Sequence, residues 1–211
     1  MKPILFNTEM VRAILNGRKT TTRRIIKPQP TKPYWCGIGH GWDDGHGYEI
    51  KPPCQIGDVL YVRETFGNWS YENPKSLATY YQYRADYPNG AKTYEWPEFD
   101  EFGEKIICDL PKWHPSLHMP KEASRIFLKV TNVRVERLQD ITDEQAKHEG
   151  VCGLCYDAKT GEEKYDMTFF KVLWDSTVKK SDLGRYGWNA NPFVWVIEFE
   201  RCEKLLGGDG S

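Results

Sequence analysis

Apolar residues near the start of the chain follow the spacing first of a strand and then of a helix. Residues 2–6 form a short apolar run, which predicts a strand that enters the core. The next apolar residues fall on one face of a helix: Met10, Val11, Ile14 and Leu15. Asn7 or Thr8 is placed to cap this helix, and Gly17 to end it.

Three later segments have the composition of strands. Residues 59–66 and 193–200 are rich in β-branched and aromatic residues. Residues 125–135 predict a longer strand, whose apolar positions change parity between Val130 and Val133. Because the side chains of a strand alternate between its two faces, this change predicts a β-bulge.

Two helices are expected in the second half of the chain. Thr142 and Gln145 match a capping box, and Gly150 is placed to end the short helix that follows. Residues 168–176 predict another helix, with apolar side chains that mostly face the core.

Two segments lack sustained periodicity. The first, at about 27–55, is rich in Pro, Gly, Trp and His and predicts an irregular surface excursion. The second, at 67–122, predicts an aromatic-rich insertion with one or two strands, such as 79–84. We expect a single domain over residues 1–205 that carries both insertions, followed by a flexible tail at 206–211.

The order of these elements favours the α+β class. The predicted strands are separated by turns or lone helices, without the regular alternation of helix and strand that a doubly wound parallel sheet requires. A small mixed β-barrel with short flanking helices and an aromatic-rich insertion fits this order best.

The charge balance restricts the kind of partner. Lys and Arg number 29 and Asp and Glu 30, so a net charge of -1 gives no global field to hold a long phosphate backbone. Nucleic-acid contacts are therefore expected to be local. The sequence has no apolar run long enough to span a membrane and no signal-peptide pattern, which predicts a cytoplasmic protein. The oligomeric state stays open.

Six scattered cysteines predict reduced thiols rather than a disulfide framework. Cys152 and Cys155 have the spacing of metal ligands, and a zinc site completed by residues of the first irregular segment is an alternative. Because a second C-x-x-C pair is absent, we expect loop thiols and no metal.

The segment with the most suggestive chemistry is the basic, hydroxyl-rich stretch 17–24, expected in a tight turn after the first helix. Lys19 precedes Thr22 by three residues, among the cations Arg18, Arg23 and Arg24. A threonine hydroxyl is a poor nucleophile until a base removes its proton, and a lysine whose pKa is lowered by burial or nearby cations can be that base. The alternative is a solvated or phosphate-binding loop.

Several motifs together resemble the ASCH domain family, which is similar to the PUA fold. They are the string Gly17-x-Lys19-x-x-Thr22-x-Arg24, the string Gly57-Asp58-x-Leu60-x-Val62, the capped helix and the final strand. The segments 113–120 and 186–189 are similar to those of ASCH proteins common in phages and prophages. This resemblance implies a pseudo-barrel associated with RNA and modified-base recognition.

The motif also resembles that of a bacterial branch of the family that hydrolyses the amide of N4-acetylcytidine with a lysine, a threonine and a glutamate. The matching residues are Lys19, Thr22 and Glu149, with Glu144 as a second choice for the glutamate. The resemblance implies an amidohydrolase that acts on a modified nucleoside and requires no cofactor. That branch is about half as long as this chain.

In the implied mechanism Lys19 takes the proton of Thr22, whose oxygen attacks the acyl carbon. Glu149 orients the lysine or protonates the leaving amine. Arg24 or a backbone N–H of the turn stabilises the oxyanion.

Substrate contacts are expected from further side chains: Arg23, Arg24, Glu64, Tyr61, Trp35 and Trp69. An aromatic face can stack on a base, although each ring taken singly fits core or lid packing better. For Glu64, an exposed strand position with an ion pair to Arg63 or a neighbour is favoured over a place at the rim of the pocket. A non-catalytic module that binds RNA or modified DNA is the alternative function, and a nuclease is the third.

Overall fold

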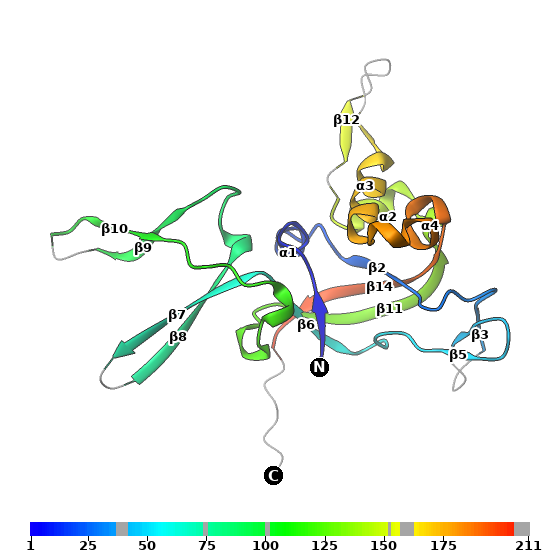
Figure 1. Cartoon of the computed structure of the whole chain (residues 1–211), viewed down its shortest axis with the longest axis horizontal. Helices are drawn as coiled ribbons and strands as arrows, with labels where there is room; N and C mark the ends of the chain where they lie inside the picture. The colour runs from blue at the N-terminus through cyan, green and yellow to red at the C-terminus, as the bar shows by residue number, and fades with distance from the viewer. Residues whose placement is uncertain (37–41, 74–75, 100–101, 152, 157–162, 205–211) are drawn as a thin grey trace, which may run out of the picture. The chain divides into compact units, whose positions relative to one another are not determined.

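The computed structural model describes residues 1–36, 42–73, 76–99, 102–151, 153–156 and 163–204 (Figure 1). The chain is α+β, with many strands and few, short helices, as predicted. It divides into two compact units. The first contains Met1–Lys2, Ala13–Leu60 and Phe127–Ser211, and the second Pro3–Arg12 and Tyr61–Ile126.

An antiparallel sheet forms the centre of the first unit. Strand β14 (Phe193–Cys202) pairs on one side with β11 (Phe127–Arg137) and on the other with β2 (Thr21–Ile25). The predicted bulge is confirmed, since the register of β11 shifts between Val130 and Asn132. The sequence therefore predicts both β11 and β14, and the predicted ends differ from the observed ones by at most about two residues.

Strand β2 corrects the expectation that stretch 17–24 is one tight turn. Gly17 does end the first helix, with φ +71°, but residues from Thr21 onward are extended and pair with β14. Thr21, Thr22 and Arg23 are all buried. Because buried strands are usually recognised by apolar residues and these side chains are polar, the sequence does not reveal this strand. Threonine is nevertheless β-branched and favours extended backbone.

Three helices cover one face of this sheet (Figure 1). They are α2 (Asp143–His148), α3 (Met167–Thr177) and α4 (Leu183–Tyr186). The predicted capping box of α2 is confirmed, because the Thr142 hydroxyl accepts from the Gln145 N–H at 3.3 Å and the Gln145 side chain accepts from the Thr142 N–H at 3.2 Å. Gly150 follows with φ +83°.

The helices pack on the sheet through a buried apolar cluster: Leu138, Ile141, Ala146, Phe170, Trp174, Val178, Tyr186, Val194 and Val196. Val194 and Val196 point to the helix side of β14, and alternate residues of the strand point away from it. At about 25 cal/mol per Å² of buried apolar surface, such a cluster supplies much of the free energy that holds α2–α4 in place.

The first irregular segment contains a small antiparallel sheet, which corrects the expectation of wholly irregular structure. Its strands are β3 (Tyr34–Trp35), β4 (Trp42–Asp43) and β5 (Glu49–Ile50). Each strand is only two residues long, so no alternating pattern marks it in the sequence. A hairpin of β12 (Leu154–Tyr156) and β13 (Glu163–Tyr165) precedes α3.

The second unit contains most of β1 (Lys2–Leu5), α1 (Thr8–Leu15) and β6 (Val59–Arg63). The Asn7 side chain caps α1 by accepting from the Met10 N–H at 2.9 Å. The aromatic-rich insertion has more strands than predicted. They form two hairpins, β7 (Phe66–Asn73) with β8 (Ser76–Tyr83) and β9 (Thr93–Phe99) with β10 (Lys105–Asp109).

Short 3₁₀ turns connect these elements. They lie at Arg84–Asp86, Ser116–His118, Lys121–Ala123, Leu138–Asp140, Lys180–Asp182 and Trp188–Ala190. Within the described residues no strand pairing closes the sheet into a barrel. The same residues include no helix with the length and apolar character of a membrane span.

Candidate active site

Lys19 is held between α1 and β2 by backbone contacts to the end of α2. It forms an isolated antiparallel bridge with Glu149, and the Thr20 N–H donates to the His148 carbonyl at 2.9 Å. The Lys19 N–H donates to the Ala13 carbonyl at 3.1 Å. These contacts bring two segments that are 130 residues apart into direct register.

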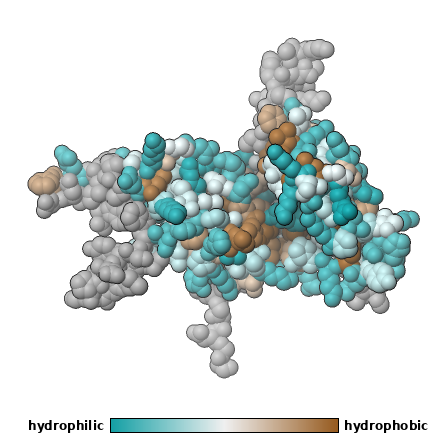
Figure 2. Space-filling model, in the orientation of Figure 1, coloured by the Kyte–Doolittle hydropathy of each residue, from teal (hydrophilic) through white to brown (hydrophobic). Residues whose placement is uncertain are grey.

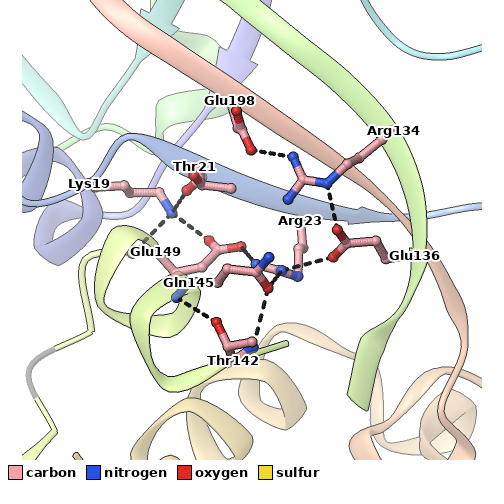
Figure 3. A network of polar contacts seen from close by, with 9 residues as sticks. All are labelled: Lys19, Thr21, Arg23, Arg134, Glu136, Thr142, Gln145, Glu149 and Glu198. Atoms are coloured by element: carbon pink, nitrogen blue, oxygen red, sulfur yellow. Dashed lines mark hydrogen bonds and ion pairs between the residues drawn. The ribbon is translucent and has the colours of Figure 1, made fainter. Parts of the chain in front are cut away.

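The Lys19 ammonium is buried and saturated with acceptors (Figure 3). Its Nζ donates to Glu149 Oε2 at 2.7 Å, to the Glu149 carbonyl at 2.9 Å and to the Thr21 carbonyl at 2.7 Å. The side chains of Lys19 and Glu149 are only 1% and 6% exposed. Burial lowers the pKa of Lys19 from its usual value, and the adjacent Glu149 carboxylate opposes this shift.

Arg23 contacts the other oxygen of the same carboxylate. Its guanidinium donates to Glu149 Oε1 at 3.2 Å, to Glu136 Oε2 at 3.2 Å and to Gln145 Oε1 at 2.9 Å. Arg23 Nε is buried and has no hydrogen-bond partner among the residues that the structure describes. Glu149 thus lies between two buried cations, one on each carboxylate oxygen.

The network continues along the sheet toward solvent. Arg134 on β11 donates to Glu136 on the same strand and to Glu198 on β14 (Figure 3). The chain of contacts alternates in charge from Lys19 to Glu198 and sums to zero. Its inner end is buried, whereas the Glu198 side chain is 38% exposed. Alternation allows these charges to be packed together, because each charge faces partners of opposite sign.

Thr22 projects from the opposite face of β2. Arg23 points toward Glu149, and successive side chains of a strand alternate, so Thr22 lies on the side of its partner residue Ile197. The Thr22 residue is buried, with 3% of its surface exposed. The Lys19 Nζ donates a hydrogen bond to the Thr21 carbonyl, which is part of the peptide bond between Thr21 and Thr22.

Arg24 lies opposite Trp195 of β14 in the register of the two strands. Burial lowers the pKa of Arg24, and Glu149 acts in the other direction. Trp195 contacts Trp42 edge-on, with ring centroids 5.9 Å apart, and Trp42 contacts Trp35 in the same way at 5.7 Å. Trp35 is 54% exposed, so this row of rings runs from the sheet to the surface.

The remaining predicted residues belong to the second unit. Glu64 is not on an exposed strand and does not pair with Arg63; it is buried and accepts two hydrogen bonds from Arg125, each 3.0 Å long. Burial raises the pKa of Glu64, and Arg125 opposes this shift. Tyr61 is half-buried in β6, and Trp69 belongs to β7. The side chain of Trp69 lies outside the described residues.

Four network residues were not predicted as part of a site: Glu136, Gln145, Arg134 and Glu198. One signal was present for Gln145, since the capping box fixed its position beside Glu149. Arg134 and Glu136 are two residues apart in β11 and share a face, but Glu136 lies one residue beyond the strand predicted at 125–135. The approach of Glu136 to Arg23 depended on β2, which the sequence did not reveal.

The proposed zinc ligands cannot be placed together. Cys152 lies outside the described residues, and only the strand position of Cys155, in β12, is described. Among the residues that are described, no group of three or more His, Cys, Asp or Glu side chains is arranged to hold a metal ion. Cys54 is a buried thiol, and burial raises its pKa to about 11.

Comparison of the chain with protein-family models, with curated proteins and with solved structures found no match. The functional argument therefore rests on the geometry of this site and on the motifs of the sequence.

Proposed function

We propose that this protein is an amidohydrolase that removes the acyl group from N4-acetylcytidine or a similar modified nucleoside. The observation that carries the proposal is the buried contact between Lys19 and Glu149, 2.7 Å long. A buried titratable group whose pKa is shifted beside a specific charged partner is typical of functional sites. Lysine becomes a useful base only when its pKa is lowered in this way.

The proposed division of roles assigns Thr22 as the nucleophile on the basis of the sequence motif, and it requires the Thr22 hydroxyl to reach Lys19 Nζ from the face of β2 opposite to Arg23. Neutral Lys19 accepts the Thr22 proton as the threonine oxygen forms a bond to the acyl carbon. The carbon–nitrogen bond then breaks, and the N4 amine takes the proton from Lys19 with help from Glu149. Water hydrolyses the acyl ester on Thr22 and regenerates the hydroxyl. The Arg24 guanidinium, which projects from the same face of β2 as Thr22, or a backbone N–H of this segment stabilises the oxyanion.

The finer fold assignment belongs to the same proposal. The Gly-x-Lys-x-x-Thr-x-Arg string, the capped helix that delivers Glu149 and the final strand support membership of the ASCH family and a PUA-like arrangement. The partner on this account is a modified nucleoside, free or within a short nucleic acid.

Incubation of the purified protein with N4-acetylcytidine tests the proposal, with chromatographic measurement of the released cytidine. We expect turnover in the wild type and a loss of at least about 10²-fold in Lys19→Ala, the contribution typical of a general base. Absence of turnover with a panel of N4-acylated cytidines would refute the function. Turnover that Lys19→Ala leaves unchanged would refute the mechanism.

The second candidate function is a non-catalytic module that binds RNA or modified DNA. The row of Trp35, Trp42 and Trp195 favours it, because the exposed ring of Trp35 at the outer end of the row can stack on a base. This candidate requires that Trp35→Ala weaken binding of a modified oligonucleotide while no cytidine is released.

A further inference from the structure

A second group of basic side chains lies in the first unit, outside the network around Glu149. Four cations approach aromatic rings there: Lys27 and Arg185 at Tyr186, Lys171 at Trp188, and Arg137 at Phe193. We call these four residues the cation cluster. The distances from the charged groups to the ring centroids are 4.5, 6.0, 5.2 and 3.6 Å, respectively.

Hydrogen bonds connect the elements that carry the cation cluster. Arg137 donates to the Asn191 carbonyl at 3.0 Å, and Gln139 donates to the Trp188 carbonyl at 2.8 Å. The Trp174 indole donates to the Tyr186 carbonyl at 2.9 Å, which ties α3 to α4. The cations are therefore fixed on one continuous group of elements, and α3 and α4 lie together in Figure 1.

Within the described residues, none of the four members of the cation cluster forms an ion pair with a carboxylate. Two acidic residues of the same elements accept hydrogen bonds from other groups: Asp175 accepts from the Trp188 N–H at 2.7 Å, and Asp182 accepts from the Ser181 hydroxyl at 3.4 Å. This differs from the network around Glu149, where positive and negative charges alternate.

We propose that the cation cluster is a binding surface for the phosphodiester backbone of a single-stranded nucleic acid. Lys27 and Arg185 are exposed, and the surface over α3 and α4 is largely hydrophilic in Figure 2. Cations without carboxylate partners match the phosphates of a flexible strand, and its bases can stack on the partly exposed rings of Trp188 and Phe193, whereas Tyr186 is buried. The net charge of the whole chain is -1, so this positive surface is a local concentration of charge.

The proposal goes beyond hydrolysis of an acylated nucleoside, since it concerns binding of a strand that carries no modification. Its success or failure does not depend on turnover at Lys19. An acidic protein segment is the competing occupant, because it offers negative charge without bases.

Fluorescence anisotropy with labelled oligouridylate of about ten nucleotides, a length within the usual site size, tests the proposal. The double variant Lys27→Ala with Arg185→Ala should weaken binding at least about tenfold. It should also reduce the slope of log affinity against log salt by about 1.4, because each phosphate neutralised on a single strand contributes about 0.7 to that slope. Lys171→Gln is a second, milder variant with the same expected direction.

The matched control removes two exposed lysines that are already paired with carboxylates. Lys51 contacts Glu49 and Lys147 contacts Glu144, each at 3.5 Å. Lys51→Ala with Lys147→Ala should leave the affinity and the salt slope nearly unchanged. The proposal is overturned if wild type does not bind the oligonucleotide, if both double variants weaken binding equally, or if poly-glutamate binds more tightly than the oligonucleotide.

Discussion

At the residue scale, the protonation of Lys19 is set by two opposing effects. Burial disfavours the ammonium, whereas the carboxylate of Glu149 and two carbonyl acceptors favour it. Burial is the larger effect, so the pKa of Lys19 lies below its usual value. A lysine with a lowered pKa loses its proton more readily, which is the property that a general base requires.

This balance predicts how the activity depends on pH. Activity should rise with pH as Lys19 loses its proton, with a midpoint below the usual lysine value of 10.5. Glu149→Gln removes the charge that raises the pKa of Lys19, so the rising limb of kcat/KM should move to lower pH, together with a lower maximum rate. Glu144→Gln on the same helix is the control, because its side chain is 70% exposed. A limb that stays in place or moves upward in Glu149→Gln would show that Lys19 is not the titrating base.

The sequence identified the central pair of the network but not its surroundings. Lys19 and Glu149 were named from the motif, and they meet as an ion pair. The contact of Arg23 with Glu149, and the projection of Thr22 to the other face, depended on strand parity in β2. The pairing of β2 with β14 determines which face of the sheet each side chain of β2 occupies. A run of polar residues has no periodic pattern from which to predict this.

At the element scale, the turn after α2 fixes the distance between that helix and Lys19. A Cβ atom added to Gly150 would lie 2.7 Å from Ala13 Cβ and 2.8 Å from Lys19 Cβ. Position 150 therefore requires glycine for two reasons: its φ is positive, and Ala13 and Lys19 approach it closely. The close approach lets the end of α2 place Glu149 against the Lys19 ammonium.

Gly150→Ala should consequently damage both stability and activity. The left-handed conformation costs about 1–2 kcal/mol for a residue with a Cβ, and the overlap adds about 1–3 kcal/mol. Gly17→Ala is the matched control, because Gly17 also has a positive φ but has open space where a Cβ would lie. Chemical denaturation and turnover of both variants measure the difference. Equal losses of stability in the two variants would contradict a packing role for Gly150.

Elements that carry their own local signal were predicted, and elements that depend on partners were not. The capping box of α2, the bulge of β11 and the strand β14 follow from residue type and spacing. Strands β3–β5 are too short for periodicity, and α4 has a single turn. Their formation depends on tertiary contacts such as that between Trp42 and Trp195.

At the scale of the whole molecule, the two units differ in what they carry. The first holds the Lys19 network, the tryptophan row and the cation cluster. The second holds the two aromatic-rich hairpins and a separate ion pair between the buried Glu64 and the partly exposed Arg125. Every group to which we assign catalysis therefore belongs to the first unit. The chemistry can be tested there by substitutions that leave the second unit unchanged.

The most direct test of the central claim compares two adjacent threonines on β2 in the hydrolysis of N4-acetylcytidine. Thr21 and Thr22 are 5% and 3% exposed and project from opposite faces of the strand. Valine keeps the shape and backbone of either residue, including the Thr21 carbonyl that Lys19 binds. We predict that Thr22→Val abolishes release of cytidine. Thr21→Val should keep the rate within about tenfold of the wild type, a difference of about 1.4 kcal/mol in activation free energy. Full activity in Thr22→Val, with a normally folded protein, would contradict Thr22 as the nucleophile.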